Sequence, residues 1–78
     1  MTIQKLIDQT FSYSVEAKHC PGLAKAYLGD MKGYQKVQRL LESRDYRSAI
    51  LAIDKMDSIP REQILSAITE EFGNRFMH

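Results

Sequence analysis

Apolar residues recur at steps of three and four along this chain, and no segment alternates apolar and polar residues at every second position. A period near 3.6 is that of an amphipathic helix with one buried side, whereas a half-buried strand shows a period of two. The pattern is clearest near the start, where one stripe comprises Ile3, Leu6, Ile7, Thr10, Phe11, Ser14 and Val15. The sequence therefore predicts an all-α fold.

Glycine, proline and capping residues divide this pattern into five predicted helices. Thr2 is the expected cap of the first helix, and the sequence HCPG at residues 19–22 should end it, because the residue before a proline disfavours helical backbone angles. Gly29 should end a short second helix, and Asp30 can cap the third. The predicted helices cover residues 2–18, 21–28, 31–42, 46–56 and 59–72, and a tail follows at 73–78.

The link between residues 42 and 46 is short, so the helices on either side of it should pack as antiparallel neighbours. We therefore expect a central antiparallel helix hairpin within a small bundle of four to five helices, formed by a single domain of residues 1–78. The helix at 46–56 has a broad apolar face and is predicted to be the most buried. That face comprises Tyr46, Ala49, Ile50, Leu51, Ala52, Ile53 and Met56.

The length of 78 residues bears on stability, since a small domain buries a modest share of its surface and often gains stability from a partner.

The location of the protein is predicted from its cysteine content, apolar runs and opening residues. Cys20 is the only cysteine, so no disulfide can form within the chain. The longest apolar run, residues 49–53, is far shorter than the ~20 residues that span a bilayer. Because the opening residues also lack the order of a signal peptide, we expect a cytoplasmic protein with no membrane contact.

The segment 34–60 resembles one helix hairpin of the tetratricopeptide family. That family places a small alanine, then a large apolar residue four positions later, then a proline that closes the unit. The family's tryptophan and Leu-Gly pair are absent, and the chain has one copy where roughly three repeats form a stable array. The resemblance implies a scaffold that holds a peptide or helix in a groove. The matching positions are Tyr34, Tyr46, Ala49, Ile53 and Pro60.

Residues with catalytic or metal-binding chemistry are few and unfavourably spaced. His19 and Cys20 are adjacent in sequence, which rarely gives the geometry of a nucleophile and its base. Glu70 and Glu71 diverge by about 100° on a helix, and the sequence lacks CxxC, HxxxH and a glycine-rich phosphate loop. We therefore expect no enzyme activity, no metal, no cofactor and no small-molecule substrate.

Charge is unevenly distributed along the chain, although the net charge is only +1. Residues 25–47 hold six basic and three acidic residues, whereas residues 54–71 hold five acidic and two basic residues. Separate surfaces of opposite charge favour docking to another protein or to a second copy as a homodimer. The sequence therefore predicts a small non-enzymatic adaptor or inhibitor, of a kind that would suit a phage or plasmid accessory protein. The candidate contact residues are Tyr13, Arg44, Arg47, Glu62, Glu70 and Phe76.

Nucleic-acid binding is the alternative. Residues 23–42 have the order of a helix-turn-helix, with a helix of small residues, a turn at Gly29 and a second helix with basic side chains. The apolar residue expected about six positions after the turn glycine is replaced by Gln35, so the motif would be divergent. Such a protein would be a DNA-binding transcriptional regulator. The side chains that would face DNA are Lys32, Gln35, Lys36 and Arg39.

Overall fold

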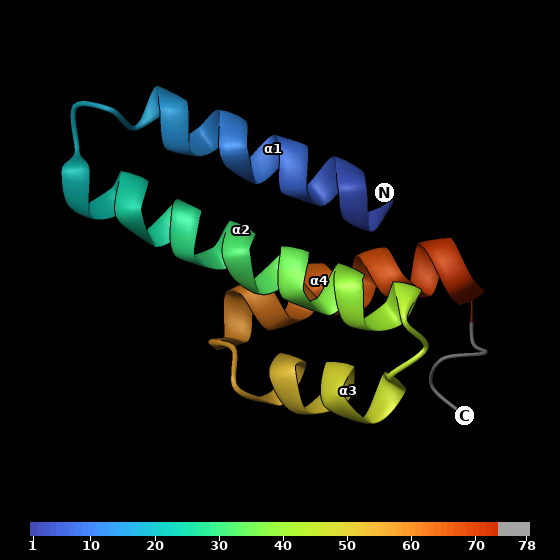
Figure 1. The fold of residues 1–78 in the computed structure, drawn as a ribbon. Helices are drawn as coiled ribbons and strands as arrows, with labels where there is room; N and C mark the ends of the chain where they lie inside the picture. Colours follow the sequence, from blue (N-terminus) through green and yellow to red (C-terminus); the bar gives the residue numbers. More distant parts are fainter. Residues whose placement is uncertain (74–78) are drawn as a thin grey trace.

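Four α-helices account for most of the residues that the computed structural model describes, which are residues 1–73 (Figure 1). They are α1 (Ile3–Glu16), α2 (Pro21–Glu42), α3 (Tyr46–Asp54) and α4 (Ser58–Phe72). No strand occurs within this range, so the all-α prediction is confirmed. Residues 74–78, with the candidate contact residue Phe76, lie outside the described residues.

The break predicted at Gly29 is wrong, because α2 passes through it as one helix of 22 residues. A glycine in a helix interior costs only about 1 kcal/mol relative to alanine, and α2 contacts α1 on both sides of it. Before the glycine, Tyr27 packs against Tyr13. After it, Gln38 donates a hydrogen bond of 3.0 Å to Gln4. Packing of both predicted segments against α1 therefore keeps them continuous as one helix.

The hydrophobic core lies where all four helices meet, and we call this part of the molecule the base. α3 was predicted to be the most buried helix, but it buries only Ala49 and Ile53, and Ile50 is 45% exposed. The helix packs along one side on α2, so the rest of its broad apolar face lies at the surface. The core side chains are Ile3, Leu6, Ile7, Tyr34, Val37, Leu41, Ala49, Ile53, Ile64, Ala67 and Ile68.

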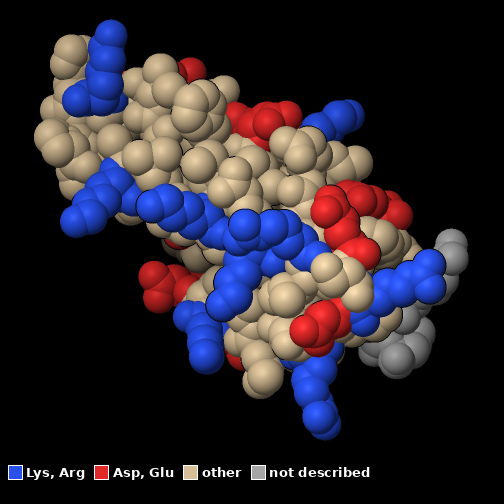
Figure 2. All heavy atoms as spheres, viewed as in Figure 1, with Lys and Arg blue, Asp and Glu red and all other residues tan. Residues whose placement is uncertain are grey.

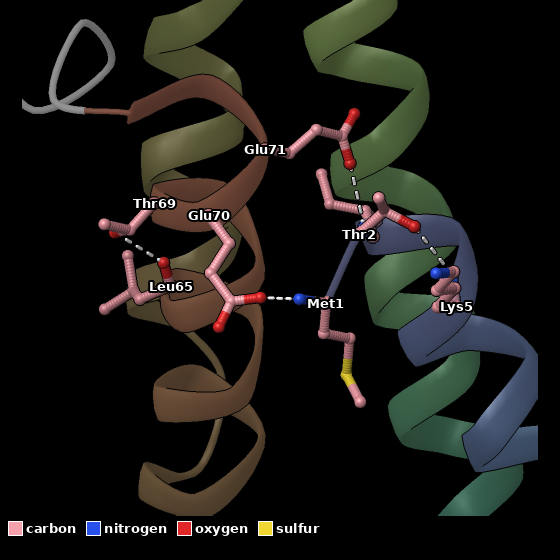
Figure 3. Close-up of polar contacts among 8 residues, drawn as sticks. Met1, Thr2, Lys5, Leu65, Thr69, Glu70 and Glu71 are labelled. Carbon is pink, nitrogen blue, oxygen red and sulfur yellow. Dashed lines mark hydrogen bonds and ion pairs between the residues drawn. The ribbon is translucent and has the colours of Figure 1, made fainter.

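Two glutamates join the last turn of α4 to the first turn of α1 (Figure 3). The backbone N–H of Ile3 donates a hydrogen bond of 2.9 Å to Oε1 of Glu71, and the amino group of Met1 forms an ion pair with Glu70. Thr2 caps the same turn, as predicted. The N–H groups of a first helical turn have no partner within the helix, so the Glu71 carboxylate stabilises the start of α1.

The hairpin of α1 and α2 extends beyond α3 and α4, and the link between its two helices lies at the far end (Figure 1). We call residues 15–33 the free end. None of these residues is fully buried, whereas the buried side chains of α1 and α2 all lie outside this range. Large apolar side chains in it, among them Val15, Leu23 and Leu28, are exposed. The free end is therefore a two-helix layer whose large apolar side chains are mostly exposed.

Candidate functional site

A groove of about 330 Å³ lies between α1 and α2, beside the first turns of α4. Three of its residues, Tyr27, Asp30 and Tyr34, follow one another at steps of three and four and so share one side of α2. α1 contributes Leu6 and Tyr13 among others. Ile59 lines the groove from the first turn of α4 and is 71% exposed. The groove begins at the base and continues towards the free end.

Two tyrosine rings meet in this groove. The ring centroids of Tyr13 and Tyr27 lie 5.6 Å apart, with the ring planes inclined at 43°. Tilted pairs at this distance are favourable because the positive ring edge approaches the negative ring face. Tyr13 remains 42% exposed, so one ring of the pair is open to a partner. The structure therefore places Tyr13, a predicted contact residue, in the groove.

Asp30 supplies a carboxyl group to the groove from inside α2, and not from the capping position predicted for it. Partial burial raises the pKa of this carboxyl above its usual value, and the nearby charge of Asp57 raises it further. Tyr34 is only 3% exposed, and burial followed by the charge of Asp30 raises its pKa to about 12. At neutral pH the phenol is therefore uncharged, and Asp30 is the acidic group of the groove.

A second hollow, of about 200 Å³, lies on the other side of Asp30 and is also lined by Met56 and Asp57. The link that holds these two residues approaches α2 closely at Gly33. A Cβ atom at that glycine would lie 3.2 Å from Cε of Met56. The small residue thus allows the link to pack against α2, and this packing brings the charge of Asp57 near Asp30.

The other predicted contact residues that lie within residues 1–73 do not line the groove. Arg44, Arg47 and Glu62 are exposed at the surface, and Arg44 adopts a left-handed backbone angle of φ 60° directly after α2. Glu70 is engaged by the amino group of Met1. Of the predicted contact residues that the structure describes, only Tyr13 therefore belongs to the candidate site.

The helix-turn-helix predicted at residues 23–42 is not formed, because the turn it requires is part of the continuous helix α2. Its proposed DNA-facing residues Lys32, Gln35, Lys36 and Arg39 are nevertheless all exposed. Figure 2 shows lysine and arginine side chains following α2 across the face in view. The basic face is therefore present on α2, but the helix-turn-helix that was predicted to carry it is absent from the described residues.

Within residues 1–73, no group of three or more His, Cys, Asp and Glu side chains is placed to hold a metal ion. Cys20 is exposed at the N-cap position of α2, and His19 precedes it in the link. None of the four described helices combines the length and apolar character needed to cross a membrane.

Comparisons of the chain with protein-family models, with curated proteins and with solved structures find no match.

Sequence reasoning did not assign Tyr27, Asp30 or Ile59 to the candidate site. The available signal was the spacing of Tyr27, Asp30 and Tyr34, which continues one helical side across Gly29. The predicted break at Gly29 separated Tyr27 from Asp30 and Tyr34, so their common helix side was not recognised. Ile59 had no such signal, because its position depends on how the first turn of α4 packs beside α1 and α2.

Proposed function

We propose that this protein is a non-enzymatic binding module that holds an amphipathic helix of a partner protein in the groove between α1, α2 and α4. The observation that carries the proposal is the open tyrosine pair beside Ile59 and Asp30 in one groove. Exposed aromatic and aliphatic side chains in a groove are the usual anchors for such a helix. A role as an adaptor or inhibitor in the cytoplasm is the corresponding cellular function.

The groove also defines the chemistry of the partner helix. Its apolar side should cover Tyr13, Tyr27 and Ile59, which requires apolar residues at helical spacing. A lysine or arginine at the edge of that side should reach Asp30, whose carboxylate has Asp57 as an acidic neighbour. A partly buried carboxylate next to a like charge gains from a cationic partner, and such charge-assisted hydrogen bonds are the stronger ones.

Selection of helical peptides from a displayed library tests the proposal. We expect selected peptides to share apolar residues at i, i+3 or i+4, and i+7, with a lysine or arginine at one fixed position. Fluorescence anisotropy then measures their affinity for the wild type and for Asp30→Asn. We expect about a tenfold loss in Asp30→Asn, which corresponds to about 1.4 kcal/mol, and no further loss when the peptide's basic residue is also changed to glutamine.

Two controls make the test specific to the groove. Glu62→Gln removes an acidic side chain of α4 that does not line the groove, and it should leave affinity unchanged. Tyr13→Ala removes one ring of the open pair and should weaken every selected peptide. Equal affinity for the wild type, Tyr13→Ala and Asp30→Asn would contradict the proposal. Light scattering that shows a dimer broken by Tyr13→Ala would instead assign the groove to a second copy.

A further inference from the structure

Four basic residues form a straight row on the side of α2 that faces away from the groove. They are Lys25, Lys32, Lys36 and Arg39, and all four are exposed. With about 100° of rotation per residue, they fall within an arc of about 60°, and Tyr34 lies on the opposite side of the helix. With a rise of 1.5 Å per residue, the row extends for about 21 Å. We call it the basic row.

The basic row is also unbroken by opposite charge. Asp30, the only acidic residue between Lys25 and Arg39, points to the groove side of α2. None of the four basic side chains forms an ion pair with another described residue. Figure 2 shows a line of lysine and arginine side chains along α2 on the face in view. The row therefore offers four positive charges on one rigid helix.

The lack of other side chains in this arc indicates the kind of ligand. Between Lys25 and Arg39 this arc of about 60° contains the four basic residues and no other, and it has no aromatic ring. Gly29 and the exposed Leu28 lie about 20° beyond its two edges. A protein interface gains most of its affinity from a buried apolar or aromatic centre, and a single-stranded nucleic acid gains it from stacking on aromatic rings. A phosphate backbone requires only positive charge held in a line.

We propose that the basic row binds the phosphate backbone of duplex nucleic acid without reading its sequence. α2 would lie along the backbone and would not insert a recognition helix, since the helix-turn-helix is absent. The proposal is independent of peptide binding, because the row and the groove lie on opposite sides of α2. Peptide and duplex binding can therefore succeed or fail separately.

Fluorescence anisotropy with a mixed-sequence 24-base-pair duplex tests this proposal over a range of salt concentrations. Four phosphate contacts give an expected slope of about −3.6 in a plot of log affinity against log salt. Affinity should therefore fall roughly 100-fold between 50 and 200 mM NaCl. The double variant Lys36→Gln with Arg39→Gln should bind more weakly, with a slope of about −1.8.

The control is Lys5→Gln with Lys18→Gln, which removes the same net charge from exposed residues outside the basic row. We expect this variant to keep the wild-type slope and affinity. Equal weakening in both double variants would overturn the proposal, because net charge alone would then account for binding. Absence of binding at 50 mM NaCl would also overturn it. So would stronger binding of poly-glutamate than of a duplex with equal charge, which would assign the row to an acidic protein.

Discussion

The base and the free end of this molecule are built from the same two helices, α1 and α2, but differ in what covers them. At the base, α3 and α4 complete a core that includes Ile3, Val37 and Ile68. At the free end, residues 15–33 contain no fully buried side chain, although the apolar stripe of α1 continues into it at Val15. An apolar pattern therefore specifies a helix side that is available for burial, and a covering element decides whether burial occurs.

The groove lies at the transition between these two regions. Its residues Leu6 and Tyr34 belong to the core, whereas Tyr13, Tyr27 and Ile59 are wholly or partly exposed. A site at this transition combines a rigid base with open apolar side chains, which suits a docking surface.

Shortening a core residue at the base should have the largest effect. Ile68 is fully buried, so Ile68→Ala should lower the free energy of unfolding by about 2–5 kcal/mol, through lost burial and a residual cavity. Val15→Ala, at the free end, should change it by no more than about 0.5 kcal/mol. Urea denaturation followed by circular dichroism measures both values. Similar losses in the two variants would show that the free end is as well packed as the base.

A proline at Gly29 should be nearly as damaging. In a continuous α2 it removes a backbone hydrogen bond and clashes with the preceding turn, at a cost of about 3 kcal/mol or more. A helix that ended at Gly29 would tolerate the proline, so the substitution distinguishes one helix from two. The helical circular dichroism signal and the urea midpoint should both fall. An unchanged midpoint would restore the two-helix prediction.

Removing the carboxylate of Glu71 should loosen the base to a smaller extent. Glu71→Ala deletes the acceptor for the N–H of Ile3 and should cost about 1 kcal/mol, as the loss of a helix cap does. Glu62→Ala is the matched control, because it removes an exposed carboxylate from the same helix. Hydrogen exchange should show faster exchange of the first amides of α1 in Glu71→Ala alone. Equal exchange in both variants would contradict the capping role.

Gly29→Ala should stabilise the protein slightly. A Cβ atom at this position meets nothing within 4 Å, and alanine is favoured over glycine in a helix by up to about 1 kcal/mol. Gly33→Ala is a useful comparison, because its Cβ atom would lie 3.2 Å from Met56. We expect a smaller gain or a loss there. Thermal unfolding measures both, and destabilisation by Gly29→Ala would indicate a strained backbone at this glycine.

The smallest effect should be the pH dependence caused by Asp30. Its pKa in the folded protein is raised above 3.8 by burial and by Asp57, so ionisation of this carboxyl opposes folding. Its contribution to stability is fully present below pH 3.8 and is lost as the pH rises through the raised value. Asp30→Asn should therefore be slightly more stable than the wild type at pH 7, with no difference at pH 3. Urea denaturation at the two pH values measures this, and lower stability of the variant at pH 7 would give Asp30 a structural role instead.

Sequence reasoning reached the helical class and the cap at Thr2 because each depends on local spacing. Tyr13 lines the groove, and its role as a contact residue stays a prediction. Sequence reasoning failed at Gly29 and at Ile50, and each failure has a tertiary cause. α1 holds α2 continuous through the glycine, and α3 is covered on one side only.

Local sequence pattern specified helical segments with one apolar side each, because the period of the pattern is a property of neighbouring residues. The alignment of Lys32, Lys36 and Arg39 also follows from the sequence, since all three lie in one predicted helix, whereas Lys25 joins the basic row only because α2 is continuous. The continuity of α2, the covering of particular apolar sides and the position of the groove come from tertiary packing instead. These features depend on contacts between residues far apart in the chain. A local sequence pattern does not specify which apolar helix sides pack against each other.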